Sequence, residues 1–137
     1  MDITKSQIKG LVYRVIGAAI EVHKLLGPGL LESVYHRCME KELKLKNIRF
    51  KSELLVPLNY KGLEIDTRLR CDMLIEDILT VELKSVKEIL PIHETQILTY
   101  IKLLQVPKGI LINFNTNHIY REGQRTYVNE LYRRLKD

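Results

Sequence analysis

Residues 70–84 have the sequence Arg70-Cys71-Asp72-Met73-Leu74-Ile75-Glu76-Asp77-Ile78-Leu79-Thr80-Val81-Glu82-Leu83-Lys84, in which two short apolar runs meet at an acidic turn. This pattern predicts a β-hairpin. Apolar residues alternate with polar ones along the second run. Side chains two positions apart in a strand point to the same side, so Glu82 and Lys84 share one face of the sheet.

The pairing of the two strands decides whether this hairpin carries a site. If the turn is centred on Asp77, paired residue numbers sum to 154, and Asp72 faces Glu82 with Cβ atoms roughly 5 Å apart. Two carboxylates at that distance repel one another unless a cation or a proton lies between them, which favours a divalent metal site with Lys84 beside it. Two alternatives remain. Glu82 and Lys84 could form a solvated strand face, and a two-residue loop at Glu76-Asp77 would place Asp72 opposite Val81.

Composition limits the class of protein. The chain has 137 residues, of which 45% are hydrophobic, and we expect residues 1–137 to form a single domain. A formal charge of +5, from 22 basic and 17 acidic residues, suits a partner that carries phosphates but is only a modest excess. Two cysteines without a CxxC pair argue against a disulfide scaffold or a cysteine-ligated zinc. No signal peptide and no apolar run of ~18 residues is present, so we expect a cytoplasmic protein without membrane contact.

Two helices are predicted before the strands. Thr4-Lys5-Ser6-Gln7 has the form of a capping box ahead of a helical apolar pattern, and Gly27-Pro28-Gly29 separates this helix from one spanning about Leu30 to Lys46. With Gly29 as the cap, Glu32 is the third helical residue and Tyr35 follows one turn later on the same side. From position alone, a structural role for Glu32 at the positive end of the helix is favoured.

A three-stranded antiparallel meander is predicted next. Its first strand has alternating apolar residues before a turn at 59–62, and Pro57 suggests an edge strand or a bulge. A third helix follows at about 92–105, then a buried strand at 110–114, a short strand at 118–120 and a last helix at 126–136. On the third helix, the apolar side carries Ile97, Ile101 and Leu104, and a polar stripe carries His93, Gln96 and Tyr100. That stripe either faces water or binds phosphate and orients ligands.

The order of these elements resembles the core of the PD-(D/E)xK nuclease superfamily, with an acidic residue on the second strand and Glu-x-Lys on the third. Gly29–Tyr35 fits the GxxExxY signature of one small bacterial and archaeal branch. Ile92 to Gln96, followed by Tyr100, resembles the QxxxY helix motif of the RecB-like nucleases. The strand Leu111–Phe114 is also typical of the branch. The resemblance covers about Ile20 to Phe114 and implies an α/β (α+β) fold with a restriction-endonuclease-like core.

The resemblance also implies an activity, a cofactor and a set of site residues. The expected activity is metal-dependent hydrolysis of phosphodiester bonds in nucleic acid, with DNA as the expected substrate and Mg²⁺ or Mn²⁺ as the cofactor. Asp72, Glu82 and the backbone carbonyl of Leu83 would hold one cation, and Glu32 would ligate it through water or help to hold a second. Lys84 is the signature lysine. The substrate-contacting residues would be Gln96, Tyr100, Tyr35 and His93.

The sequence departs from the superfamily pattern at two positions close to the expected site residues. Cys71 stands where the superfamily name has a proline, and Ser52 or Glu53 lies where relatives often carry glutamine, so neither receives a role. Two other functions remain open. One is a non-catalytic module that binds DNA or RNA on a nuclease fold, and the other is a structural subunit. A homodimer or a partner protein is compatible with each.

Overall fold

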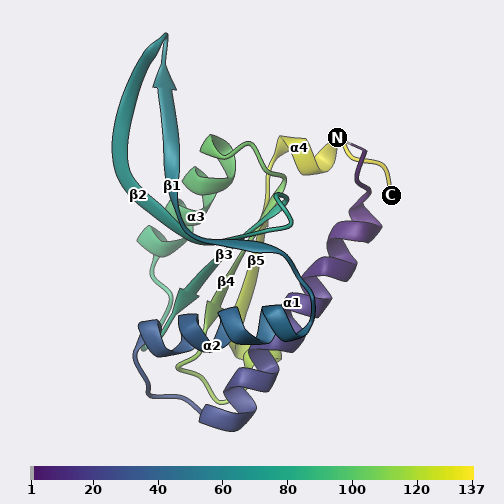
Figure 1. The fold of residues 1–137 in the computed structure, drawn as a ribbon, viewed down its shortest axis with the longest axis vertical. Coiled ribbons are helices and arrows are strands. Elements are labelled where there is room, and N and C mark those ends of the chain that lie inside the picture. The colour runs from purple at the N-terminus through teal and green to yellow at the C-terminus, as the bar shows by residue number, and fades with distance from the viewer. Residues whose placement is uncertain (1) are drawn as a thin grey trace.

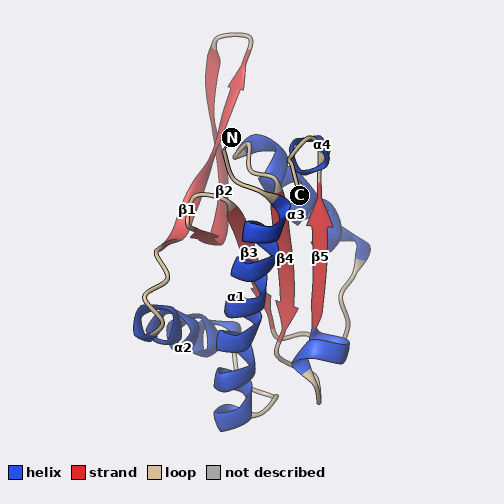
Figure 2. Cartoon of the chain, turned by 90° about the vertical axis from the view of Figure 1, so that its right-hand side faces the viewer, coloured by secondary structure: helices blue, strands red, loops and turns tan. Residues whose placement is uncertain are grey.

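The computed structural model describes residues 2–137, in which five strands form one sheet with helices on both faces (Figure 1, Figure 2). The helices are α1 (Lys5–Leu26), α2 (Glu32–Leu45), α3 (Pro91–Leu103) and the short α4 (Glu130–Arg133). The strands are β1 (Phe50–Tyr60), β2 (Leu63–Ile75), β3 (Leu79–Lys84), β4 (Lys108–Asn113) and β5 (Gln124–Val128). They lie in the order β1-β2-β3-β4-β5, and only β3 and β4 are parallel. The predicted α+β class is confirmed.

Helix α1 begins as the sequence predicts. The Thr4 side chain accepts a hydrogen bond from the Gln7 amide, and the Gln7 side chain accepts one from the Thr4 amide, which completes the capping box. Gly27 ends the helix with a positive φ of 69°, a conformation that glycine adopts without strain. No helix within residues 2–137 is both long enough and apolar enough to cross a lipid bilayer.

The hairpin of β2 and β3 has the predicted register. Met73 pairs with Val81 and Ile75 with Leu79, so paired numbers sum to 154 and the two-residue loop is excluded. Glu76 and Asp77 both have positive φ in the connecting turn. The β1–β2 hairpin is longer, and its register shifts between Leu55 and Pro57, which confirms the bulge predicted at the proline.

Helices cover both faces of the central strands. Helices α1 and α2 pack on one face in the main core cluster, and α3 packs on the other through Ile97 and Ile101. Every residue of β3 except Lys84 is therefore buried, including the polar Thr80 and Glu82. The alternative of a solvated strand face for Glu82 is thus wrong.

The C-terminal region departs from the prediction. Residues 118–120 do not form a strand, because the His118 ring accepts a hydrogen bond from the Arg121 amide and starts the helical turn η1 (Ile119–Gly123). The fifth strand is β5, which pairs with the free edge of β4. The helix predicted at 126–136 is reduced to α4, since sheet pairing holds residues 124–128 extended and the Asn129 side chain caps the helix only after that strand.

Close packing between α3 and the sheet gives a stability prediction at Gly109. A Cβ atom there would lie 2.6 Å from Thr80 Oγ1 and 2.9 Å from side-chain atoms of Ile97 and Ile101. We expect Gly109→Ala to lower the free energy of unfolding by ~1–3 kcal/mol, measured by urea denaturation, because the added methyl overpacks the interface. Gly10→Ala is the control: no atom lies within 4 Å of its Cβ position on α1, so a gain of ~0.5–1 kcal/mol is expected. Equal stability of Gly109→Ala and the wild type would contradict this packing.

Candidate active site

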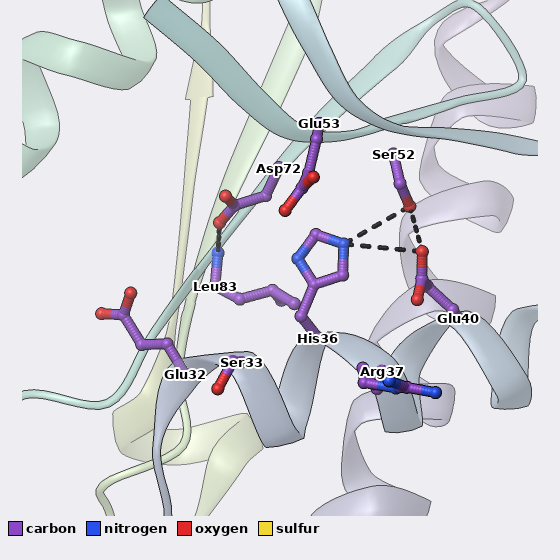
Figure 3. A pocket seen from close by; sticks show the side chains of 9 residues that line it. All are labelled: Glu32, Ser33, His36, Arg37, Glu40, Ser52, Glu53, Asp72 and Leu83. Carbon is purple, nitrogen blue, oxygen red and sulfur yellow. Dashed lines mark hydrogen bonds and ion pairs between the residues drawn. The ribbon is translucent and has the colours of Figure 1, made fainter.

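A cleft of about 500 Å³ lies where the first half of α2 faces the inner ends of the β1–β2 hairpin and of β3 (Figure 3). Its lining is strongly polar. The residues that line it are Glu32, Ser33, His36, Arg37, Glu40, Ser52, Glu53, Asp72 and Leu83. Asp72 and Leu83 bring the predicted hairpin site to this cleft, and Glu32 faces it from α2.

The side chains of Asp72 and Glu82 each accept a hydrogen bond from a backbone amide of the opposite strand at the end of the β2–β3 ladder. The Asp72 amide donates to Glu82 Oε2 at 2.7 Å, and the Leu83 amide donates to Asp72 Oδ2 at 2.8 Å. Regular backbone pairing ends at Met73 and Val81. Beyond that pair the two carboxylates, and not backbone carbonyls, accept the hydrogen bonds of the Asp72 and Leu83 amides. The second oxygen of each carboxylate, Glu82 Oε1 and Asp72 Oδ1, takes no part in these two hydrogen bonds. These oxygens are therefore candidate metal ligands.

Burial makes this carboxylate pair electrostatically unusual. Glu82 is 3% exposed, and burial together with the nearby Asp72 carboxylate raises the pKa of Glu82 to about 8. Burial also raises the pKa of Asp72, although the hydrogen bond from Leu83 and the charges of His36 and Lys84 oppose that change. Two acids held this closely keep a proton or require a cation, which agrees with the metal site that the sequence of the hairpin favours.

Glu82, Lys84, Gln96 and Tyr100 are not among the residues that line the cleft, although Lys84 and Tyr100 lie within electrostatic reach of the carboxylate pair. The half-buried Lys84 lowers the pKa of both carboxylates, so its ammonium is within electrostatic reach of each. Tyr100 is 2% exposed, and burial, followed by the charge of Glu82, raises the pKa of its hydroxyl. Gln96 lies one turn earlier on α3 and is half-buried. The polar stripe predicted on α3 therefore turns inward at Tyr100 instead of facing water.

Glu32 occupies a different helical position from the predicted one. Helix α2 begins at Glu32, with Leu31 as its cap, so Glu32 is the first helical residue and not the third. Its Oε1 accepts a hydrogen bond from the Ser85 amide at 3.3 Å, and the Ser85 hydroxyl donates to the Leu30 carbonyl at 2.6 Å. These two contacts attach the start of α2 to the segment that follows β3.

Tyr35 and His93, both predicted to contact substrate, have structural partners. Tyr35 is fully buried, and its hydroxyl donates to the Gly27 carbonyl at 2.5 Å and accepts from the Leu30 amide at 3.2 Å. The His93 ring accepts a hydrogen bond from the Leu90 amide at the start of α3. The burial of Tyr35 corrects its predicted role: it holds the loop between α1 and α2 and offers no surface to a substrate.

The hydroxyl of Tyr35 gives a second stability prediction. We expect Tyr35→Phe to lower the free energy of unfolding by ~1–3 kcal/mol, because the Gly27 carbonyl and Leu30 amide lose a buried partner while the stacked contact with Phe114 remains. Thermal and urea denaturation measure the change. Tyr13→Phe is the matched control, since Tyr13 is 80% exposed, and it should leave stability unchanged. Equal effects of the two substitutions would rule out this role.

Six residues that line the cleft received no role from the sequence: Ser33, His36, Arg37, Glu40, Ser52 and Glu53. The Ser52 hydroxyl donates to Glu40 Oε2 at 2.6 Å, and His36 Nε2 lies 3.4 Å from Ser52 Oγ and 3.7 Å from Glu40 Oε2. Figure 3 shows the His36 ring between this pair and Asp72. The i, i+4, i+8 spacing of Glu32, His36 and Glu40 on one helix face was the available signal.

No set of three His, Cys, Asp or Glu side chains within residues 2–137 forms a ready-made metal cluster. The carboxylates of Asp72 and Glu82 influence one another's charge at the end of the hairpin, and Glu32 lines the cleft beside Asp72. Any cation bound here would therefore rest on this pair and the adjacent backbone, with Glu32 as a more distant ligand.

The mixed sheet, the helices on its two faces and the acidic pair at the end of β2 and β3 define a protein with a restriction-endonuclease-like fold. A family model described as the PD-(D/E)XK nuclease superfamily matches residues 9–126, so the chain belongs to that superfamily. No curated protein and no solved structure matches the chain.

Proposed function

We propose that this protein hydrolyses phosphodiester bonds of nucleic acid in a reaction that depends on Mg²⁺ or Mn²⁺. The observation that carries the proposal is the close approach of the Asp72 and Glu82 carboxylates at the end of the hairpin, each bound to a backbone amide of the opposite strand, with Lys84 within electrostatic reach. Membership of the nuclease superfamily supports the same activity.

The donor set suits a hard divalent cation. Two carboxylates and the Leu83 carbonyl are oxygen ligands, which magnesium and manganese prefer. The raised pKa of Glu82 supports this fit, because a cation between the two acids would offset both the burial and the repulsion from Asp72 that favour a proton there. When bound, such a cation lowers the pKa of its water and neutralises charge on the phosphate.

The residues of the site have three roles in the proposed reaction: holding the cation, activating the water or stabilising the phosphate, and supporting the site. Asp72, Glu82 and the Leu83 carbonyl would hold the cation, and Glu32 at the start of α2 would ligate it through water or help to hold a second. Lys84 orients and helps to deprotonate the attacking water, or stabilises charge on the phosphate. Gln96 and Tyr100 support the site from α3, where the buried Tyr100 borders the carboxylate pair.

We take DNA as the substrate and the GxxExxY, RecB-like branch as the position within the superfamily. Both assignments rest on the motifs of residues 29–35 and 92–100. The net charge of +5 suits a polyphosphate substrate. A binding module that does not cut nucleic acid is the alternative, and the buried pair of acids argues against it, because a site that only binds phosphate gains nothing from two carboxylates.

To test this function, the purified protein is incubated with single-stranded, double-stranded and branched DNA, and with RNA of the same sequence. Each substrate is assayed with Mg²⁺, with Mn²⁺ and with EDTA. Cleavage of DNA that requires metal supports the proposal. Salt-dependent binding without cleavage, unchanged by EDTA, would replace it with the binding module. Preferential cleavage of RNA would keep the reaction and change the substrate.

A further inference from the structure

Helix α2 carries three basic side chains on its solvent side, Arg37, Lys41 and Lys44, which we call the basic stripe. All three residues are exposed. Spacings of four and three residues place them above one another on one side of the helix, and the buried residues of α2 lie on the opposite side. Glu42 lies off this side, because it is separated by about 100° from Lys41 and by more from the other two.

The basic stripe begins at the wall of the cleft. Arg37 lines the cleft together with Ser33, which lies one turn earlier on the same side of α2. Figure 3 shows the Arg37 side chain directed away from Asp72. Lys41 and Lys44 follow beyond the residues of α2 that line the cleft, and a rise of 1.5 Å per residue separates Arg37 from Lys44 by ~10 Å along the helix. The stripe therefore leads from the cleft along the outer side of α2.

No neighbouring acid balances the charges of the basic stripe. Within residues 2–137, none of its three side chains forms an ion pair. Glu40 borders the stripe, but its Oε2 accepts a hydrogen bond from the Ser52 hydroxyl at 2.6 Å on the cleft side. Lys41 follows Arg37 by four positions and precedes Lys44 by three, and like charges at these spacings destabilise a helix. A bound polyanion would offset this repulsion.

The cleft itself offers few cations to a nucleic acid. Arg37 is the only arginine or lysine among the described residues that line it, whereas four of the nine are acids: Glu32, Glu40, Glu53 and Asp72. Contacts between basic side chains and backbone phosphates supply most of the affinity of proteins for nucleic acid. The phosphates that flank the scissile one therefore need cations outside the acidic part of the cleft, and the basic stripe is the adjoining surface that has them.

We infer that the basic stripe binds the backbone phosphates of a nucleic acid strand whose scissile phosphate lies in the cleft. This inference rests on the proposed function and adds the path of the substrate. Because a duplex strand advances 3.4 Å per nucleotide, the ~10 Å from Arg37 to Lys44 corresponds to about three nucleotides. Phosphate contacts carry no base information, so the stripe gives affinity and orientation without sequence preference.

The salt dependence of binding tests the inference. Fluorescence anisotropy measures the affinity of the full chain for a labelled DNA duplex, in EDTA so that metal-dependent cleavage does not occur. The α2 variant combines Arg37→Gln, Lys41→Gln and Lys44→Gln. Each phosphate contact contributes about 0.9 to the slope of log affinity against log salt concentration. The α2 variant should therefore have a slope shallower by about 2–3, and each single substitution should reduce it by about 0.9.

The matched control removes the same charges from other elements. Lys24→Gln on α1, Lys102→Gln on α3 and Arg121→Gln on η1 change exposed residues outside the cleft and the basic stripe. The control variant has the same net charge as the α2 variant, so the general attraction of the protein for DNA is matched. We expect its slope to equal that of the wild type.

Two further measurements separate lost contacts from lost structure. The α2 variant should melt no lower than the wild type, because it removes like charges from an exposed helix face. A conservative variant that combines Arg37→Lys, Lys41→Arg and Lys44→Arg should keep the wild-type slope. The single substitutions decide the test if the triple variant does not fold.

Equal slopes for the wild type and the α2 variant would overturn the inference, as would equal losses in the α2 variant and the control. Failure of the wild type to bind DNA or RNA would overturn it as well. Cleavage decides the proposed function separately. A protein whose slope depends on the basic stripe but that never cleaves keeps this inference and loses the proposed function, whereas cleavage with an unchanged slope does the reverse.

Discussion

Asp72→Asn is expected to abolish metal-dependent cleavage, with a loss of roughly 10²–10³-fold or more. The substitution keeps the shape of the side chain and an oxygen that can accept the Leu83 amide, so the hairpin should stay folded. It removes one of the two negative charges that would attract the cation. Cleavage assays with each metal, together with the shift in melting temperature on adding Mg²⁺, measure the two consequences.

The Lys84→Met variant distinguishes the role of the lysine in catalysis from the role of the carboxylates in binding metal. We expect it to lose cleavage by a similar factor while keeping the stabilisation by Mg²⁺, because the two carboxylates remain and only the ammonium near them is removed. Asp72→Asn should lose both cleavage and metal stabilisation. Asp2→Asn and Lys102→Met change exposed residues of the same types and should match the wild type. If cleavage persists in either site variant, the activity comes from a contaminant and the assignment is wrong.

Glu82→Gln is expected to stabilise the metal-free protein above pH 8. The pKa of Glu82 is raised from its ordinary value of 4.5 to about 8 in the folded state. A raised carboxyl pKa means that the folded state holds the proton more tightly than the unfolded state, so the resulting stability is fully present below pH 4.5. It is lost as the pH rises towards 8. Since one pKa unit corresponds to ~1.4 kcal/mol, the loss amounts to a few kcal/mol.

The glutamine variant cannot ionise and should lack this pH dependence. Urea denaturation in EDTA between pH 4 and 9 should therefore show a decline for the wild type and a flatter profile for Glu82→Gln. Adding Mg²⁺ should restore the stability of the wild type at pH 8 and should have little effect on the stability of Glu82→Gln. Glu88→Gln, at an exposed position in the segment before α3, should follow the wild type. Parallel profiles for the wild type and Glu82→Gln would show that no strained acid pair exists at this site.

The local parts of the fold were predictable because they depend on residues close in sequence. The capping box of Thr4 and Gln7 marks the start of α1, and Gly27 marks its end. The turn at Asp77 sets the β2–β3 register, and Pro57 places the bulge. Each is decided by hydrogen bonds or backbone angles within a few residues.

The C-terminal segment was not predictable in the same way. Its apolar residues at 128, 131, 132 and 135 have helical spacing, yet residues 124–128 form an edge strand. The deciding factor is the unpaired edge of β4, whose backbone groups are satisfied by Gln124 to Val128. That edge exists only after β3, α3 and β4 have assembled.

The sequence by itself predicted the hairpin of residues 70–84 and favoured the register that opposes Asp72 to Glu82, while the structure excluded the alternative two-residue loop at Glu76-Asp77. Only the tertiary structure decided the environment of that pair. Helices on both faces of the sheet bury Glu82, and this burial raises its pKa. Helix α2 brings Glu32 and His36 to the cleft that Asp72 lines. The same packing turns Tyr35 inward to hold a loop. Spacing along the chain sets which residues share a face, whereas burial and charge depend on distant elements that pack against that face.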